Sequence, residues 1–263
     1  MALTLYHSAY STCSQKVRLV LAEKGLAFTS CEISFAKQAQ LDPAYLKINP
    51  NGVVPTLVHD GEVIMDSSVI VEYLEEIAPA PALVPDTPVG RARMRVWLRF
   101  MEEVPTKAIR VPSFQDVFLP TLRLIKRKGA FQKDADQRTL RKSFYGKMSQ
   151  GQGFPATEIA ESQHHLQMTV DRIEAALATG PWIMGAQLTL VDLTLAPLVD
   201  RMLDLKMLEP FRTAERTLDW MHRLQARPSY DVAFFKGARL SDRPEFQYAK
   251  LRNWFGAKRS TQA

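Results

Sequence analysis

The first part of the chain alternates between short apolar runs and one stretch with helical spacing. Apolar positions over Leu3–His7 and Phe28–Ile33 predict two β-strands. Between them, apolar residues from Val17 to Ala22 predict a helix, and Gly25 suits the C-terminus of that helix. A strand, a helix and a second strand are therefore expected before residue 35.

A β-hairpin is the clearest local feature of the sequence. Two apolar runs, Val53–Val58 and Val63–Met65, flank Asp60-Gly61, a dipeptide that favours a tight two-residue turn. Pro55 lies inside the first run, where its missing N–H is incompatible with a central strand. A cis Val54–Pro55 bond would resolve this conflict and expose the backbone of Val54 to a ligand.

Asp66, Ser67 and Ser68 follow the hairpin and precede the helical spacing of Val69–Ile77. Their carboxylate and hydroxyl groups can cap that helix, whose first N–H groups attract anions. An ordinary N-cap accounts for these residues equally well when they are taken alone. Together with a short helix expected over residues 38–47, the order of elements is βαβ–αββα, which is typical of a thioredoxin-like layout.

The second part of the chain reads as helical. Four prolines between residues 79 and 88 predict a linker, which places the domains at residues 1–80 and 89–255. A long helix is expected from Gly90 to about Pro105, and another over Thr157–Ala178. Thr189 and Asp192 have the spacing of a capping box at the start of a further helix. Residues 109–152 have only weak periodicity. The fold class is α/β followed by all-α.

The composition argues against a membrane protein, a disulfide-rich protein and a nucleic-acid-binding protein. The chain is 46% hydrophobic and 24% charged, and no run approaches the roughly 20 apolar residues of a membrane helix. With two cysteines and no basic leader, we expect a cytoplasmic protein without a disulfide framework, a bound metal or a membrane. Residues 1–88 carry 5 basic and 10 acidic side chains, so the net charge of +6 arises in the remainder. No nucleic-acid motif accompanies this charge, so we expect no nucleic-acid partner.

Hydroxyl and thiol groups cluster before the first helix, where Ser11, Thr12, Cys13 and Ser14 follow one another. A helix N-terminus stabilises anions, and hydroxyl groups can donate hydrogen bonds to a thiolate. The run would therefore suit a bound thiolate. A Ser- and Thr-rich N-cap without catalytic function has the same sequence.

These segments resemble the cytosolic glutathione transferases. Asn49-Pro50, Val54-Pro55, the hairpin and the Asp66-Ser67 pair resemble the glutathione site of that family, and the Thr189 capping box resembles its second domain. The resemblance implies a thioredoxin-like domain, then an all-helical domain, with glutathione as co-substrate. By resemblance, the Val54–Pro55 segment pairs with the cysteinyl backbone, and Asp66 and Ser67 hold the γ-glutamyl group. Gln40 is expected near the glycyl carboxylate.

The resemblance leaves three residues open as the group that acts on the thiol. Ser11 matches the activating serine of zeta-class transferases, whereas counting back from Glu23-Lys24-Gly25 matches Ser14 to the serine of bacterial β-etherase transferases. Cys13 falls where beta-class transferases carry a cysteine, which would imply thiol exchange through a mixed disulfide. Ser11 is the first choice, Ser14 the second and Cys13 the third.

The second domain most resembles bacterial β-etherase-like transferases, which cleave aryl ethers. The function expected is therefore a glutathione transferase that attacks an apolar, aromatic electrophile. The alternatives are a non-catalytic glutathione-binding protein, a Cys13-dependent deglutathionylating enzyme and a maleylacetoacetate-type isomerase. A homodimer is expected from the family. Six side chains are candidates for the electrophile pocket: Trp97, Phe100, Met101, Phe114, Phe118 and Tyr145. Ordinary core packing explains each of them as well, and it is the preferred interpretation for Trp97.

Overall fold

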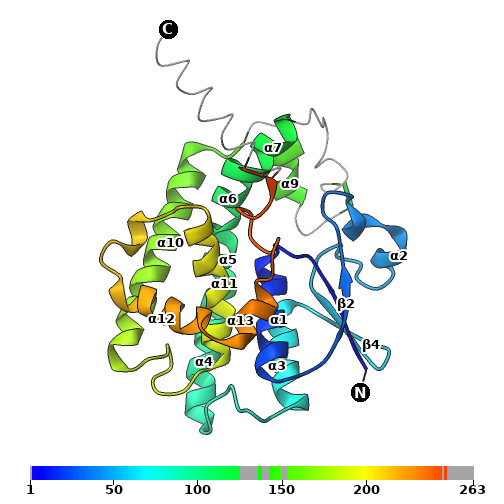
Figure 1. Ribbon diagram of the computed structural model, residues 1–263. Coiled ribbons are helices and arrows are strands. Elements are labelled where there is room, and N and C mark those ends of the chain that lie inside the picture. Colours follow the sequence, from blue (N-terminus) through cyan, green and yellow to red (C-terminus); the bar gives the residue numbers. More distant parts are fainter. Residues whose placement is uncertain (1, 125–135, 138–141, 150–152, 245, 248–263) are drawn as a thin grey trace.

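The two strands predicted at the start of the chain pair in parallel and form half of a mixed sheet. This computed structural model describes the chain except residues 1, 125–135, 138–141, 150–152, 245 and 248–263 (Figure 1). Strands β1 (Leu3–His7) and β2 (Thr29–Glu32) are joined by helix α1 (Thr12–Glu23), so this unit is a βαβ crossover. Gly25, at φ 63°, ends α1 in the left-handed conformation that glycine adopts without steric cost.

The predicted hairpin supplies the other half of the sheet. Strands β3 (Thr56–His59) and β4 (Glu62–Met65) are antiparallel, and the sheet order is β2-β1-β3-β4. Asp60 and Gly61 both have positive φ, as the tight turn requires. The Val54–Pro55 bond is cis, as predicted. Strand β3 begins only after Pro55, so the apolar run that starts at Val53 overstated the length of the strand.

Short helices complete the first part of the chain. A 3₁₀ turn, η1 (Ala39–Leu41), and helix α2 (Pro43–Leu46) occupy the segment predicted as a short helix. Helix α3 (Ser67–Ile77) follows the hairpin, and its N-cap is Asp66. The observed order agrees with the thioredoxin-like layout predicted from the sequence. The predicted domain limits stay a prediction; the limit at residue 255 lies outside the described residues.

The described remainder of the chain is helical. Helix α4 (Pro88–Glu103) and helix α10 (Ala156–Ala176) lie where the periodicity predicts long helices. The middle segment, which the sequence left unclear, contains a π-helical turn between short helices. The shorter elements are α5 (Pro105–Ala108), α6 (Arg110–Ser113), η2 (Phe114–Phe118), α7 (Leu119–Leu124), α9 (Lys142–Ser149), η4 (Leu177–Thr179), η5 (Glu209–Phe211), α12 (Glu215–Gln225) and α13 (Pro228–Ala233).

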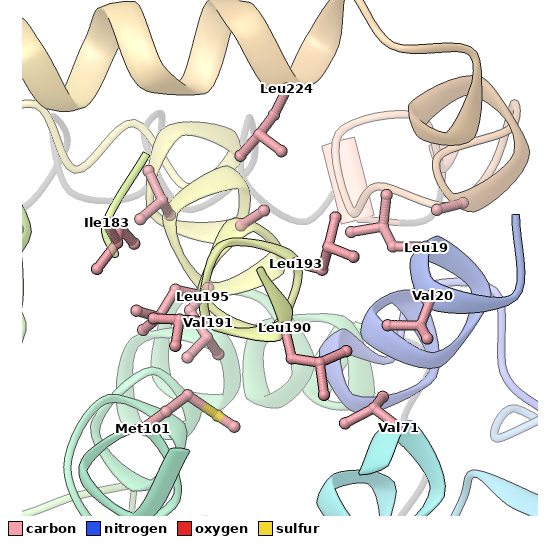
Figure 2. Close-up of a cluster of buried hydrophobic side chains, with 14 of the residues drawn as sticks. Leu19, Val20, Val71, Met101, Ile183, Leu190, Val191, Leu193, Leu195 and Leu224 are labelled. Carbon is pink, nitrogen blue, oxygen red and sulfur yellow. The ribbon is translucent and has the colours of Figure 1, made fainter. Parts of the chain in front are cut away.

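Helix α11 (Leu190–Asp204) lies at the centre of the molecule. The predicted capping box forms: the Thr189 hydroxyl accepts from Val191 N–H, and Asp192 accepts from Thr189 N–H at 2.9 Å. Figure 2 shows apolar side chains of α11 directed toward α1, α3 and α4 in one hydrophobic core. Because α1 packs on α11, the loop that precedes α1 is held by both parts of the fold. No helix in the described ranges is long and apolar enough to cross a membrane.

Candidate functional site

The reactive stretch lies at the N-terminus of α1. Ser11 is the N-cap, and its hydroxyl accepts a hydrogen bond from Ser14 N–H at 3.3 Å. The Ser11 and Cys13 side chains are partly exposed, and Cys13 is a free thiol. Ser14 is completely buried, and its Oγ accepts from Ser8 N–H at 3.3 Å. The structure therefore separates the three candidates: Ser11 and Cys13 reach the surface, and Ser14 supports the loop from inside.

The Val53–Pro55 loop is fixed by Asn49, which belongs to the Asn49-Pro50 motif noted in the sequence, and by Tyr45, which the sequence analysis did not single out. The Tyr45 hydroxyl donates to Val53 O at 2.6 Å, and Asn49 Nδ2 donates to the same oxygen at 3.0 Å. Asn49 also donates to Thr56 Oγ1 at 2.8 Å. Within the described residues, neither backbone group of Val54 has a hydrogen-bond partner. The loop therefore holds one residue whose N–H and C=O have no partner among the described residues and could pair with another peptide.

The predicted acidic-serine pair lies at the start of α3. Asp66 Oδ1 accepts from Ser68 N–H at 2.8 Å and from Val69 N–H at 3.3 Å, which caps the helix. Asp66 is exposed and Ser67 is 6% exposed. Among the residues the structure describes, Asp66 Oδ2 and Ser67 Oγ have no partner. Gln40 lies in η1, and its backbone oxygen is next to Gly52.

A partly buried ion pair, also missed by the sequence analysis, supports this helix start. Lys16 Nζ on α1 lies 2.6 Å from Glu102 Oε1 on α4. Ser68 Oγ donates to the same carboxylate oxygen at 2.6 Å and accepts from Lys16 Nζ at 2.9 Å. Burial raises the pKa of Glu102, but Lys16 and Ser68 together hold it below its ordinary value. The sequence indicated this ion pair only through the position of Lys16 on an otherwise apolar helical face.

The six candidates for an electrophile pocket fall into separate groups. Trp97 and Phe100 pack edge-to-face under the guanidinium of Arg172, and Met101 is 1% exposed in the main core. Phe114, Phe118 and Tyr145 belong to an aromatic group around η2.

One member of the set, Phe118, approaches the reactive stretch. The Phe118 ring lies 5.9 Å from the ring of Tyr10, the residue before Ser11. Tyr10 also contacts Phe35 and Phe246 with ring centroids 5.7 Å apart in each case. These contacts join the loop before α1 to η2 and to the C-terminal segment. They were not anticipated because Phe118 and Phe246 lie far from Tyr10 in the sequence.

Family models match both parts of this fold. Residues 5–82 match the model described as "Glutathione S-transferase, N-terminal domain", and residues 156–257 match the one described as "Glutathione S-transferase, C-terminal domain". The chain belongs to the glutathione S-transferase family. The enzyme class predicted from the sequence, a glutathione transferase, is confirmed, and with it the use of glutathione by the family.

Individual relatives agree with this assignment. The chain is 26% identical to glutathione S-transferase TCHQD from Arabidopsis thaliana over 235 residues, 86% of this chain and 87% of that one. It is 42% identical to protein LigF from Sphingobium sp. over 105 residues, 39% of this chain and 41% of LigF. The crystal structure of beta-etherase LigF superposes with a TM-score of 0.74 and 26% identity, covering 90% of this chain and 100% of LigF.

A glutathione complex is also among the similar solved structures. The theta-class glutathione S-transferase from Xanthomonas axonopodis pv. citri, solved with glutathione bound, is 25% identical. The superposition has a TM-score of 0.66 and covers 90% of this chain and 99% of that one. The resemblance to the glutathione transferases, with β-etherase-type enzymes among the similar proteins, is thus confirmed.

Proposed function

We propose that this transferase ionises glutathione beside Ser11 and directs the thiolate at an apolar, aromatic electrophile, with aryl ethers as the first candidates. One observation carries the proposal. Among the described residues, the backbone of Val54, Oδ2 of Asp66 and Oγ of Ser67 have no hydrogen-bond partner. Together with the partly exposed N-cap Ser11, they belong to the set that the sequence assigned to glutathione.

Val54 would hold the cysteinyl residue of glutathione. An extended peptide can pair with a free N–H and C=O on one residue in the manner of an added strand. The clamp made by Tyr45 and Asn49 keeps Val54 in place before binding, so little ordering entropy is lost on association. Pro55, as the residue after Val54, ends this pairing because it has no N–H.

Asp66 and Ser67 would hold the γ-glutamyl end, and Gln40 would contact the glycyl carboxylate. A carboxylate is the natural counter-charge for the γ-glutamyl ammonium, and a hydroxyl at a helix N-terminus suits its carboxylate. Asp66 can serve both purposes because Oδ1 caps α3 while Oδ2 has no partner among the described residues.

Ser11 is the residue best placed to donate a hydrogen bond to the thiolate. Its hydroxyl already accepts from Ser14 N–H, which leaves the hydroxyl hydrogen available for a ligand. It also lies at the positive end of α1, where a negative charge is favoured. Ser14 is fully buried, so its contribution would be to support the loop through Ser8.

The aromatic contact set around Tyr10 supports an aromatic electrophile. Tyr10 directly precedes Ser11, and its buried ring packs against Phe246, also buried, and against the partly exposed Phe35 and Phe118. Aromatic rings next to the thiolate would offer edge-to-face contacts to an aryl group. The likeness to beta-etherase LigF over 90% of this chain points in the same direction.

The test is turnover of purified protein with glutathione and matched substrates. Aryl ethers, a general aromatic halide electrophile and maleylacetoacetate would be compared under the same conditions. Release of the phenol together with a glutathione thioether supports the proposal. Binding of glutathione without turnover of any substrate would identify a binding protein, and isomerisation alone would identify the isomerase alternative.

A Cys13-dependent thiol exchange is the second candidate. The observation in its favour is that Cys13 lies in the first turn of α1 and is partly exposed. A thiolate there would attack a glutathione mixed disulfide, form a Cys13–glutathione disulfide and release the partner thiol. A second glutathione thiolate would then displace Cys13 and leave as glutathione disulfide. A trapped adduct on Cys13, seen by mass spectrometry, would support this chemistry.

We also propose a homodimer. Several of the large exposed apolar side chains of the described residues belong to β4, α3 and α4: Val63, Met65, Val69, Val89 and Val96. Strand β4 is an edge of the sheet, which a partner can cover. The net negative first part and the net positive remainder would attract each other across two copies.

A further inference from the structure

Three consecutive carbonyl groups in the loop before α1 accept hydrogen bonds from two buried arginines. Arg18 on α1 donates to Ser8 O at 3.2 Å and to Ala9 O at 2.7 Å. Arg201 on α11 donates to the next carbonyl oxygen, that of Tyr10. Arg18 and Arg201 are 1% and 5% exposed. The oxygen side of this loop is therefore turned into the protein.

The acceptors that bind the charged guanidinium of Arg18 are backbone carbonyl groups and the ring of His7. Its remaining donors reach Nδ1 of His7 at 2.9 Å and the oxygen of Ala233 at 2.7 and 3.1 Å. Within the described residues it makes no ion pair with a carboxylate, and burial lowers its pKa to about 10, against the opposing charge of Glu32. Burying a charge in this way is costly, so packing alone is a poor reason for an arginine here.

Arg201 connects the same loop to the central helix of the second part of the chain. Its guanidinium also lies 3.4 Å from Ser113 Oγ on α6 and 3.8 Å from Asp204 on α11. Helix α11 is held by its capping box and is buried along most of its length. Arg201 therefore fixes Tyr10 to a rigid element, whereas Arg18 fixes Ser8 and Ala9 to α1 itself. Helix α1 packs against both α11 and α13, and the three helices lie close together in Figure 1.

The direction of these carbonyl groups matters for a thiolate. A carbonyl oxygen that faces the sulfur would repel its negative charge, whereas N–H and hydroxyl donors stabilise it. With the oxygens of Ser8, Ala9 and Tyr10 held inward, the loop presents the Ser11 hydroxyl at the N-terminus of α1. Preorganised donors are effective because no reorganisation is needed when the charge forms.

We propose that Arg18 and Arg201 are positioning residues that together hold the Ser8–Tyr10 backbone so that Ser11 donates to the glutathione thiolate. This inference rests on the proposed role of Ser11. Neither arginine touches the sulfur; each acts through the loop. Without Arg18, the Ala9 oxygen loses its hydrogen bond from the guanidinium and the Ser8 oxygen keeps a hydrogen bond of 3.3 Å from Ser11 N–H. Without Arg201, the Tyr10 oxygen loses its hydrogen bond from that guanidinium. In either case the loop is held less firmly, and the Ser11 hydroxyl spends less time at hydrogen-bond distance from the sulfur.

The experiment measures the pKa of the bound thiol by thiolate absorbance, together with kcat and the dissociation constant for glutathione. In Arg18→Met and Arg201→Met, we expect the thiol pKa to rise by about 0.5–1 unit and kcat at neutral pH to fall about 3- to 10-fold. Glutathione affinity should stay within about 2-fold, because the binding contacts lie elsewhere. Arg18→Lys and Arg201→Lys, which keep charge and one donor group, should restore part of both changes.

The matched control is Arg227→Met. Arg227 Nε lies 2.6 Å from Glu23 Oε1, so this arginine joins α13 to the opposite end of α1 without touching the loop. The thiol pKa should be that of the wild type in this variant. An equal shift in Arg227→Met, or a wild-type thiol pKa and kcat in the folded Arg18 and Arg201 variants, overturns the inference. If a Met variant does not fold, its Lys variant decides, and a wild-type thiol pKa there counts against the inference.

Ser11→Ala, measured in parallel, separates the two proposals. An unchanged thiol pKa in Ser11→Ala means that the proposed role of Ser11 itself fails. A raised thiol pKa in Ser11→Ala, without any change in the arginine variants, rejects the positioning role alone.

Discussion

Trp220 Nε1 donates a hydrogen bond of 2.9 Å to Oδ1 of Asp192, and both residues are fully buried. The same carboxylate accepts from Ile183 N–H at 2.9 Å and from Thr189 N–H at 2.9 Å. Burial raises the pKa of Asp192, and these donated hydrogen bonds oppose the rise. One side chain thus joins the start of α11 to α12 and to the turn at Ile183.

This relationship predicts a large loss of stability in Asp192→Ala. Several buried donors would be left without an acceptor, and we expect a cost of about 3 kcal/mol or more in the free energy of unfolding. Trp220→Phe removes one donor and should cost less. Urea unfolding measures both. The control is Asp219→Ala on the exposed face of α12, which should stay within about 0.5 kcal/mol; an equal loss there would contradict the assignment.

His7 predicts a dependence of stability on pH. Burial, with Arg18 adding to the effect, lowers the pKa of His7 from 6.5 to about 4 in the folded protein. The unfolded chain then binds the proton more readily, so stability should fall as pH drops from about 6.5 toward 4. In His7→Gln this part of the pH dependence should disappear. Urea unfolding at several pH values checks it, and an identical slope in both proteins would rule it out.

Local patterns predicted most of the fold because they act over a few residues. The turn at Asp60-Gly61, the cap at Asp66 and the Thr189 box each depend on neighbouring side chains, and each is observed. The middle helices were not predictable, since Pro112 and Pro120 interrupt the periodicity and η2 is π-helical, with a different spacing.

The contacts that hold the candidate site in place could not be predicted, because they join residues far apart in the sequence. Lys16 and Glu102 are 86 positions apart, and Arg201 reaches Tyr10 across 191 positions. Sequence spacing carries no information on such contacts. The only available signal was that Lys16 and Arg18 lie within an apolar helix, where a charge needs a buried partner.

The proposed role of Asp66 predicts that removing its charge weakens the binding of glutathione. Asp66→Asn keeps an oxygen that can cap α3 but removes the charge opposite the ammonium. We expect glutathione to bind about 10- to 100-fold more weakly, the range for a charge-assisted hydrogen bond. Asp66→Ala should add a loss of helix stability of about 1 kcal/mol. Calorimetry measures binding; unchanged affinity in folded Asp66→Asn would refute the assigned role.

The proposed homodimer can be tested at the exposed valines of α3 and α4. Val69 on α3 is 55% exposed and Val96 on α4 is 59% exposed. In a homodimer that covers them, Val69→Asp and Val96→Asp should shift the protein to a monomer because a charge would be buried. Sedimentation at micromolar concentration distinguishes the states. Val232→Asp on α13, a similarly exposed valine, is the control. A wild-type protein that is monomeric at this concentration contradicts the dimer.

The alanine series at Ser11, Cys13 and Ser14 separates the chemistries of the reactive stretch. If Ser11 donates to the thiolate, Ser11→Ala should raise the thiol pKa and lower turnover at neutral pH about 10-fold or more, with little change in glutathione affinity. Cys13→Ala should be nearly silent. Ser14→Ala should have a smaller effect in the same direction, because Ser14 holds the loop through Ser8 N–H.

The measurement is a pH–rate profile for each variant, with mass spectrometry of the wild-type protein after glutathione disulfide treatment. Under thiol exchange the pattern inverts: Cys13→Ala loses activity, and an adduct forms on the wild-type protein but not on Cys13→Ala. A stable Cys13 adduct together with full activity in both serine variants would overturn the serine mechanism. We expect the opposite result, because the partly exposed Ser11 hydroxyl lies at the helix N-terminus, where it can donate to a thiolate without a change of covalent state.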